Sequence, residues 1–199
     1  MSFDLYLRGD NLALANVLEH LDNYPEFERQ ELPDSAYALV NPSTGVYCYF
    51  RLDDDDTASS RGKSLCFSLN YNRQTFFALE TLPLVESLCK RFQLVVEDPQ
   101  EEVVGPASLN ELIKSWRVHN ERAVKSIEAQ GMALNYMHES KANEWWEYAR
   151  VREKLSTDLG DSVFVPEVFI IKRASEEPFR MIVWPEGNRQ PILQVAGSR

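Results

Sequence analysis

The sequence predicts an α+β protein, in which a mainly antiparallel sheet carries about four helices packed on it. Short runs of alternating apolar and polar residues, typical of half-buried strands, recur through the first half of the chain. The predicted order there is strand, helix, three strands, helix, strand, which differs from the regular alternation of a parallel α/β sheet. We therefore expect helices on one face of an antiparallel sheet.

The chain begins with a predicted strand and a predicted helix. Apolar and polar side chains alternate along Phe3–Arg8 with the period of a strand. Asp10 or Asn11 can cap a helix that continues to about Asp22. Residues 23–34 read as a polar connector.

Residues 36–99 contain three strands, a helix and a further strand. Pro42 and Gly45 suit a tight turn between the first two strands. Pro83 is expected to start or kink the helix, because proline has no backbone N–H to donate. The expected elements are strands over 36–40, 46–52 and 64–72, a helix over 75–92 and a strand over 93–99.

Two long helices and three short strands are expected in the second half. Ser108 and Glu111 have the spacing of a capping box, and Gly131 is a suitable helix stop. Pro166 indicates an edge strand or a bulge. The expected elements are helices over 108–131 and 142–159, and strands over 162–173, 179–185 and 191–195.

Length and composition fit a single α+β domain over residues 1–199, and a division near 99–107 gives the alternative of sub-lobes 1–98 and 108–199. Apolar residues make up 44% of the 199 residues and charged residues 26%, which is enough to build a substantial core. No apolar run has the length of a membrane span, and the N-terminus lacks the pattern of a secretory signal. Three cysteines without a CxxC pair fit reduced thiols, so a cytoplasmic protein is expected.

Most of the negative charge lies in the first quarter of the chain. The formal net charge is -10, and residues 1–56 hold twelve acidic residues against three arginines and no lysine. Nucleic-acid binding is not expected, because phosphate contacts need clustered Lys and Arg. The acidic segment is either a surface that attracts a basic protein or simply a charged, solvated surface. The candidate partner-binding residues are Glu26, Glu28, Glu31, Asp53, Asp54, Asp55 and Asp56.

The four consecutive aspartates lie between two strands that should pair with each other. A calcium loop that begins at Asp53 needs glycine at its sixth position and glutamate at its twelfth, where this chain has Ala58 and Ser64. Adjacent side chains also point in different directions, so they seldom converge on one ion. A solvated hairpin tip or a docking element is therefore favoured over a metal site.

Catalytic and cofactor motifs are missing from the sequence. The segment HESKA begins like the zinc motif HExxH but has Ala142 in place of the second histidine. There is no GxSxG elbow and no glycine-rich phosphate loop, and Cys89 within its predicted helix is typical of a buried structural thiol. We expect no metal and no cofactor, and the sequence favours a non-catalytic protein over an enzyme.

Polar residues on apolar helix stripes suggest a second kind of site. Asn120 and Arg152 lie where their predicted helices should face the core, and buried polar groups need partners. They belong either to a small polar pocket or to a structural network that joins helices to sheet. The candidate pocket residues are Asn70, Arg73, Trp116, Asn120, Trp145 and Arg152.

Several segments together resemble a family of uncharacterised bacterial proteins. They are FDLYL, NPSTGVYCYF, FSLNYNRQTFFALETLPLVESL, VEDPQ, SWRVHNERA, WWEYARVREKLSTDLGDSVFVPEV and VWPEG, and they cover most of the chain. This resemblance implies no named activity and no functional residues. In character, a small acidic α+β protein of this kind is similar to immunity proteins, which neutralise bacterial toxins.

Non-catalytic protein binding is the function that the sequence favours. Its most concrete form is an immunity-type inhibitor that presents the acidic N-terminal surface to a basic toxin. The alternative is a small-ligand binder or enzyme that uses the polar pocket near Trp116, Asn120 and Arg152. An oligomeric scaffold is the third interpretation.

Overall fold

The computed structural model describes residues 2–9, 14–34, 36–53, 64–132, 134, 137–173 and 178–183. The chain forms two compact units, Met1–Ala133 and Leu134–Arg199. Segment 99–107, where the sequence suggested a division, lies inside the first unit. Whether the two units behave as one domain stays a prediction.

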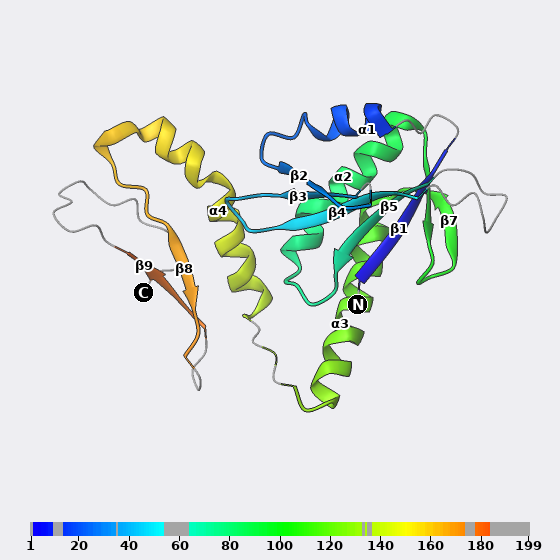
Figure 1. Ribbon diagram of the computed structural model, residues 1–199. Coiled ribbons are helices and arrows are strands. Elements are labelled where there is room, and N and C mark those ends of the chain that lie inside the picture. Colours follow the sequence, from blue (N-terminus) through cyan, green and yellow to red (C-terminus); the bar gives the residue numbers. More distant parts are fainter. Residues whose placement is uncertain are drawn as a thin grey trace. The chain divides into compact units, whose positions relative to one another are not determined.

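A seven-stranded sheet dominates the first unit (Figure 1). Its strand order is β2-β3-β4-β5-β1-β6-β7, and every neighbouring pair is antiparallel. The predicted α+β class with a mainly antiparallel sheet is therefore confirmed. The strands are β1 (Ser2–Arg8), β2 (Glu28–Leu32), β3 (Ala36–Val40), β4 (Tyr47–Asp53), β5 (Ser64–Asn70), β6 (Val95–Asp98) and β7 (Val103–Pro106).

The core lies on one face of this sheet. The alternation in β1 buries Phe3, Leu5 and Leu7 completely. Leu5 pairs with Phe67, which in turn pairs with Phe50, so large apolar side chains form a row across the three central strands. Each such buried side chain contributes roughly 1.5–3 kcal/mol of apolar transfer free energy.

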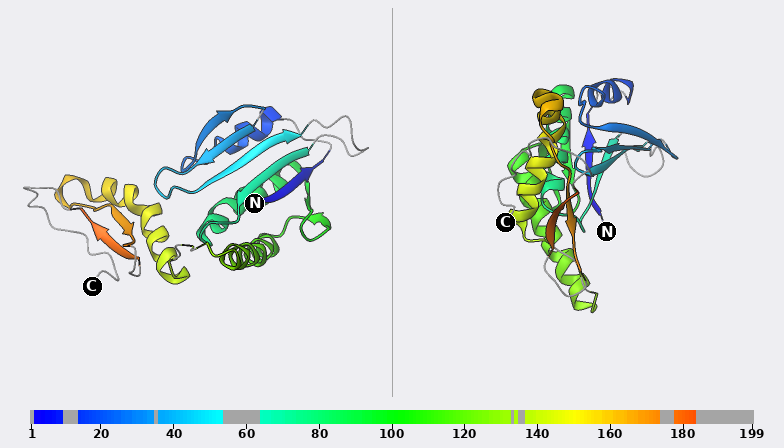
Figure 2. Two further views of the ribbon diagram at one scale, coloured as in Figure 1. Left: turned by 60° about the horizontal axis from the view of Figure 1, so that its bottom comes forward. Right: turned by 90° about the vertical axis from the view of Figure 1, so that its left-hand side faces the viewer.

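Three helices belong to the first unit: α1 (Leu14–Leu21), α2 (Phe76–Phe92) and α3 (Leu109–Ala129). Helix α2 packs on β4 and β5, and α3 packs along α2, as Figures 1 and 2 show. Pro83 lies inside α2 and does not start it, contrary to one expectation. The favourable free energy of burying the neighbouring Leu82 and Leu84 offsets the loss of the helix hydrogen bond that proline cannot donate.

Two edge strands, β2 and β7, were not predicted from the sequence. All five side chains of β2 are exposed, and β7 has the burial pattern exposed, exposed, half-buried, exposed. A strand that buries neither face shows no period-two pattern, so the connector prediction for residues 23–34 was wrong over β2.

The predicted capping box at the start of α3 does not form. Ser108 is the N-cap residue, but its side chain makes no capping hydrogen bond. A carboxylate from α2 replaces it, because Glu86 Oε1 accepts the backbone N–H of Leu109 at 3.3 Å. The helix ends near Gly131, as predicted, and this glycine has a φ of 76°.

The described residues of the second unit form one long helix, a short 3-10 helix and a small hairpin (Figure 1). Helix α4 begins at Glu139, three residues before the predicted start, and Trp145 Nε1 donates to the carbonyl of Val168 at 2.7 Å. The predicted strand over 191–195 lies outside the described residues. The elements are α4 (Glu139–Leu159), η1 (Gly160–Ser162), β8 (Val168–Ile171) and β9 (Phe179–Ile182), the last two paired antiparallel.

Candidate functional site

Strand β2 and the turn before it form an acidic edge of the sheet, which we call the acidic edge (Glu26 and Glu28–Leu32). In the described part of the chain β2 pairs only with β3, so its other side has no strand partner. Glu26, Glu28 and Glu31 are all exposed. Because Glu28 and Glu31 are three residues apart on a strand, they point to opposite faces of the sheet.

The charges of the acidic edge are largely uncompensated. Arg29 is the only basic residue in β2, and its Nε lies 3.0 Å from a carboxylate oxygen of Asp22. No residue in the described ranges forms an ion pair with Glu26, Glu28 or Glu31. The three glutamates are thus free to meet cations of a partner.

The aspartate run follows β4. Asp53 is the last residue of β4 and pairs with Ser64 of β5, which confirms that the flanking strands pair antiparallel. Asp54, Asp55 and Asp56 lie outside the described residues. Their role as a docking element therefore stays a prediction.

The predicted polar pocket residues of the first unit meet at the turn after β5. Asn120 Nδ2 donates to the carbonyl oxygens of Tyr71 and Arg73, the latter at 3.1 Å. Asn70 Oδ1 accepts the backbone N–H of Asn72 at 2.8 Å. These contacts hold the turn against α3, which is the arrangement expected of a structural network.

Arg73 and Trp116 are also engaged in packing. The guanidinium of Arg73 donates from Nε to the hydroxyl of Tyr47 at 3.1 Å and lies over the rings of Tyr47 and Phe77. Trp116 is 0% exposed. Neither side chain lines the cavity described below.

The two remaining pocket candidates belong to the second unit. Trp145 donates to Val168, as noted above, and Arg152 is half-buried on the same helix. Burial raises the pKa of Tyr148, and the nearby positive charge of Arg152 opposes this rise. The structure therefore brings Asn70, Arg73 and Asn120 together and assigns Trp145 and Arg152 to other contacts.

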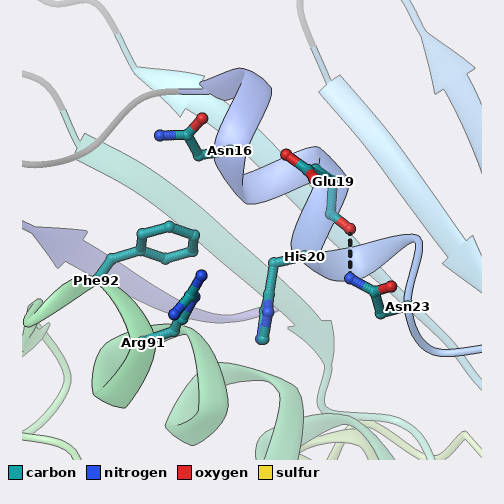
Figure 3. A pocket seen from close by; sticks show the side chains of 6 residues that line it. All are labelled: Asn16, Glu19, His20, Asn23, Arg91 and Phe92. Atoms are coloured by element: carbon teal, nitrogen blue, oxygen red, sulfur yellow. Dashed lines mark hydrogen bonds between the residues drawn. The ribbon is translucent and has the colours of Figure 1, made fainter.

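A cavity of about 420 Å³ lies between α1 and the end of α2 (Figure 3). The view shows Arg91 and Phe92 of α2 facing His20 of α1. His20 Nε2 shares a hydrogen bond with Ser87 Oγ at 2.9 Å. The lining residues are Asn16, Glu19, His20, Asn23, Arg91 and Phe92.

His20 is poised to remain neutral in this cavity. Burial lowers its pKa from the ordinary value of 6.5, and the positive charge of Arg91 lowers it further. Within the described residues no acidic side chain hydrogen-bonds to the imidazole, so this Ser–His pair lacks the third member of a nucleophilic triad. We therefore assign the pair a packing role.

A buried carboxylate that the sequence did not reveal organises the turn between β3 and β4. Glu80 is 8% exposed, and its Oε1 accepts hydrogen bonds from Asn41 Nδ2 at 2.6 Å and Thr44 Oγ1 at 3.0 Å. The partners are separated by 39 and 36 positions in the chain. The pattern of α2 alone carries no signal for this contact.

The thiols are not reactive groups. Cys48, Cys66 and Cys89 are all buried and free, which confirms the prediction for Cys89. Burial raises the pKa of Cys48, with a further rise from Glu80, and raises that of Cys89 to about 12. Reactive cysteines have lowered pKa values and are accessible, so neither thiol is a candidate nucleophile.

The described ranges hold neither a cluster of metal ligands nor a membrane-spanning helix. Within them no three His, Cys, Asp or Glu side chains gather around a common metal position. None of the helices described is both long and apolar enough to cross a bilayer.

In comparisons with known proteins, no family model matches the chain, and neither a curated protein nor a solved structure is detectably similar to it.

Proposed function

We propose that this protein binds another protein through the acidic edge, without catalysing a reaction. The observation that carries the proposal is the exposure of every side chain in an edge strand that holds uncompensated glutamates. The charged side chains of β2 disfavour indiscriminate pairing at this edge, so a strand that pairs with it must bring complementary positive charges.

Binding can combine two physical contributions. A strand of the partner can pair with the free side of β2, so that main-chain hydrogen bonds supply affinity. Lys and Arg side chains of the partner can then meet Glu28 on one face and Glu31 on the other. Long-range attraction between the acidic edge and a basic surface accelerates the encounter.

The most concrete form of the proposal is an immunity-type inhibitor. Its partner is a bacterial toxin with a basic surface, and binding takes place in the cytoplasm. The excess of acidic residues in positions 1–56 supports a basic partner. The similarity in character to immunity proteins, as a small acidic α+β protein, is a second argument for this form.

The proposal is tested first with the acidic edge itself. Glu26, Glu28 and Glu31 are replaced together by glutamine, and tagged protein is used to capture basic proteins from lysate of the native cell. We expect a partner retained by the wild type to associate at least tenfold more slowly with the triple variant at low salt, because three attractive charges are lost.

A control with the same change in net charge separates local from general effects. Glu121, Glu128 and Glu153 are exposed glutamates on other elements, and glutamine at these positions should change association little. If both triple variants slow association equally, or if the basic partner is retained equally well by the acidic-edge variant at low salt, the proposal fails.

The aspartate run is tested separately. Replacement of Asp53, Asp54, Asp55 and Asp56 by serine should slow association with the same partner and reduce its dependence on salt, because exposed charges act at long range. Unchanged association rates at low salt would remove the docking role of the loop and leave that of the acidic edge intact.

A further inference from the structure

The cavity between α1 and the end of α2, which we call the α1–α2 cavity, is lined by one cation and one anion that do not pair with each other. Glu19 belongs to α1 and Arg91 to α2, so the two charges lie on different helices. Neither forms an ion pair with a residue that the structure describes. Both charges are therefore available to a molecule bound between the two helices.

The charges of the lining balance, because His20 adds no second cation. Burial lowers the pKa of His20 and the positive charge of Arg91 lowers it further, so the guanidinium lies near the imidazole. At neutral pH the imidazole is uncharged, and the lining holds one positive and one negative side chain. A ligand with a single charge would meet repulsion as well as attraction, whereas a zwitterion can meet attraction at both of its charges.

Two asparagines of the lining can complete the recognition of a zwitterion. Asn23 Nδ2 donates to the backbone carbonyl of Glu19 at 2.9 Å, which leaves its Oδ1 as an acceptor for an ammonium group. Asn16 makes no side-chain hydrogen bond within the described part of the chain, so its amide can donate to a carboxylate. Figure 3 shows Asn16 on the same side of the cavity as Phe92.

Aromatic rings supply the apolar part of the lining. The half-buried ring of Phe92 meets the imidazole of His20 edge-on, with centroids 5.8 Å apart. Tyr24 contacts the same imidazole at a centroid distance of 5.7 Å. Because these contacts restrict the rings, Phe92 presents a defined apolar surface next to the guanidinium of Arg91 (Figure 3).

The size of the cavity suits a small molecule. Its volume of about 420 Å³ lies within the range of small-molecule clefts. The planar fork of a guanidinium matches the two oxygens of a carboxylate. In an α-amino acid the carboxylate and the ammonium are attached to one carbon atom, and the side chain leaves from the same atom. Such a molecule can therefore meet a cation, an anion and an apolar wall at the same time.

We propose that the α1–α2 cavity binds a free α-amino acid with an apolar side chain. Its carboxylate pairs with the guanidinium of Arg91, its ammonium pairs with the carboxylate of Glu19, and its side chain packs against the ring of Phe92. The site uses no residue of the acidic edge, so it is independent of the function proposed above.

The charge assignment is tested on the full chain with L-leucine and two analogues that each lack one charged group. Isocaproate lacks the ammonium, and isoamylamine lacks the carboxylate. Titrations followed by NMR should shift amide signals of α1 and of the end of α2, with leucine bound at least about fivefold more tightly than either analogue. No binding of leucine, or equal binding of leucine and one of the analogues, would overturn the proposal.

Two substitutions test which side chain meets which charge. Glu19→Gln should remove the preference for leucine over isocaproate, because the partner of the ammonium is lost. Arg91→Gln should remove the preference for leucine over isoamylamine, because the partner of the carboxylate is lost. Both residues are exposed, so the fold should be retained, and thermal unfolding checks this. A variant that keeps the preference of the wild type would show that its side chain does not contact the ligand, and the proposal would be wrong.

Matched controls carry the same changes of charge on another element. Glu121→Gln and Lys125→Gln replace exposed residues of α3 and should change the affinity for leucine less than about twofold. If they weaken leucine as much as the cavity variants do, the effect comes from the net charge of the protein and the site is refuted.

The apolar contact is tested with glycine, which has both charged groups but no side chain. Glycine should bind at least about threefold more weakly than leucine, because it leaves the ring of Phe92 uncovered. Equal binding of glycine and leucine would overturn the assignment of the ligand side chain to Phe92.

Discussion

Glu80 illustrates how one side chain determines a turn that is distant in the sequence. It lies in the middle of α2 and accepts two hydrogen bonds from the turn between β3 and β4. Both donors are buried, since Asn41 is 3% exposed and Thr44 is 5% exposed. A buried donor that loses its acceptor costs much more free energy than the hydrogen bond contributes on balance.

We therefore expect Glu80→Ala to lower the free energy of unfolding by about 2–4 kcal/mol, because it leaves two buried donors unpaired and opens a cavity. Glu80→Gln retains an oxygen at the Oε1 position and should lose less than about half as much. Urea unfolding followed by circular dichroism measures both. Equal losses for the two variants would show that the carboxylate charge, and not the acceptor, is what matters.

His20 gives the protein a predictable dependence on pH. Its pKa in the folded state is below the unfolded value of 6.5, so above this pH both states hold a neutral imidazole. As the pH falls below 6.5, the unfolded state takes up the proton before the folded state does, and stability is lost.

The wild type should accordingly lose more stability between pH 8 and pH 5 than His20→Gln does. Urea midpoints at both pH values, together with an NMR titration of the imidazole, provide the measurement. A variant that loses as much stability as the wild type over this range would assign the effect to other groups.

At the scale of an element, the C-terminal ends of two helices differ in the backbone conformation of the capping residue. The C-cap residue of α2 is Gln93, which has a left-handed φ of 56°, and the C-cap residue of α3 is Gln130, which has an ordinary φ of -84°. A left-handed backbone costs a residue with a Cβ about 1 kcal/mol, and glycine avoids this cost.

The same substitution should therefore have opposite effects at the two ends. Gln93→Gly should raise the free energy of unfolding by up to about 1 kcal/mol, whereas Gln130→Gly should lower it by a few tenths to about 1 kcal/mol. Thermal unfolding of the two variants under the same solution conditions measures both changes. Changes of the same sign in the free energy of unfolding would contradict this prediction.

Elements that bury one face could be predicted from the sequence, and elements that bury neither could not. Strand β1 and helix α3 carry clear periodicities, and both were found within two residues of their expected bounds. Strands β2 and β7 exist because a neighbouring strand offers hydrogen bonds, which leaves no pattern in their own residues.

The candidate sites likewise differ in whether they could be predicted from the sequence. The exposed glutamates of the acidic edge could be named from charge alone, because the charge of a residue is a local property. The groups around His20 and Glu80 depend on contacts between residues far apart in the chain, such as the 67 positions between His20 and Ser87. Periodicity and spacing carry no information on such pairs.

The two units differ greatly in the number of apolar side chains that they bury. The whole seven-stranded sheet and three helices lie in the first unit, together with most of the buried apolar side chains. In the part of the second unit that the structure describes, one long helix accompanies a two-stranded hairpin, and an isolated hairpin of this kind is only marginally stable. The buried apolar residues described in it are Met137, Ala142, Trp146, Ala149, Val165 and Val168.

We expect residues 1–133 to fold without the rest of the chain and to unfold cooperatively, because their core is complete. A dispersed NMR spectrum and a single denaturant transition would support this. A truncated protein that is soluble only as an aggregate, or that unfolds without cooperativity, would instead favour the single domain that the sequence predicted.

The three buried cysteines give the first unit a built-in set of chemical reporters. They lie in β4, β5 and α2, so each belongs to a different element of one core. A thiol that is buried and protonated is alkylated only when its element opens. Pulsed alkylation followed by mass spectrometry would thus rank the opening free energies of strand, neighbouring strand and helix in the natural sequence, before any residue is changed.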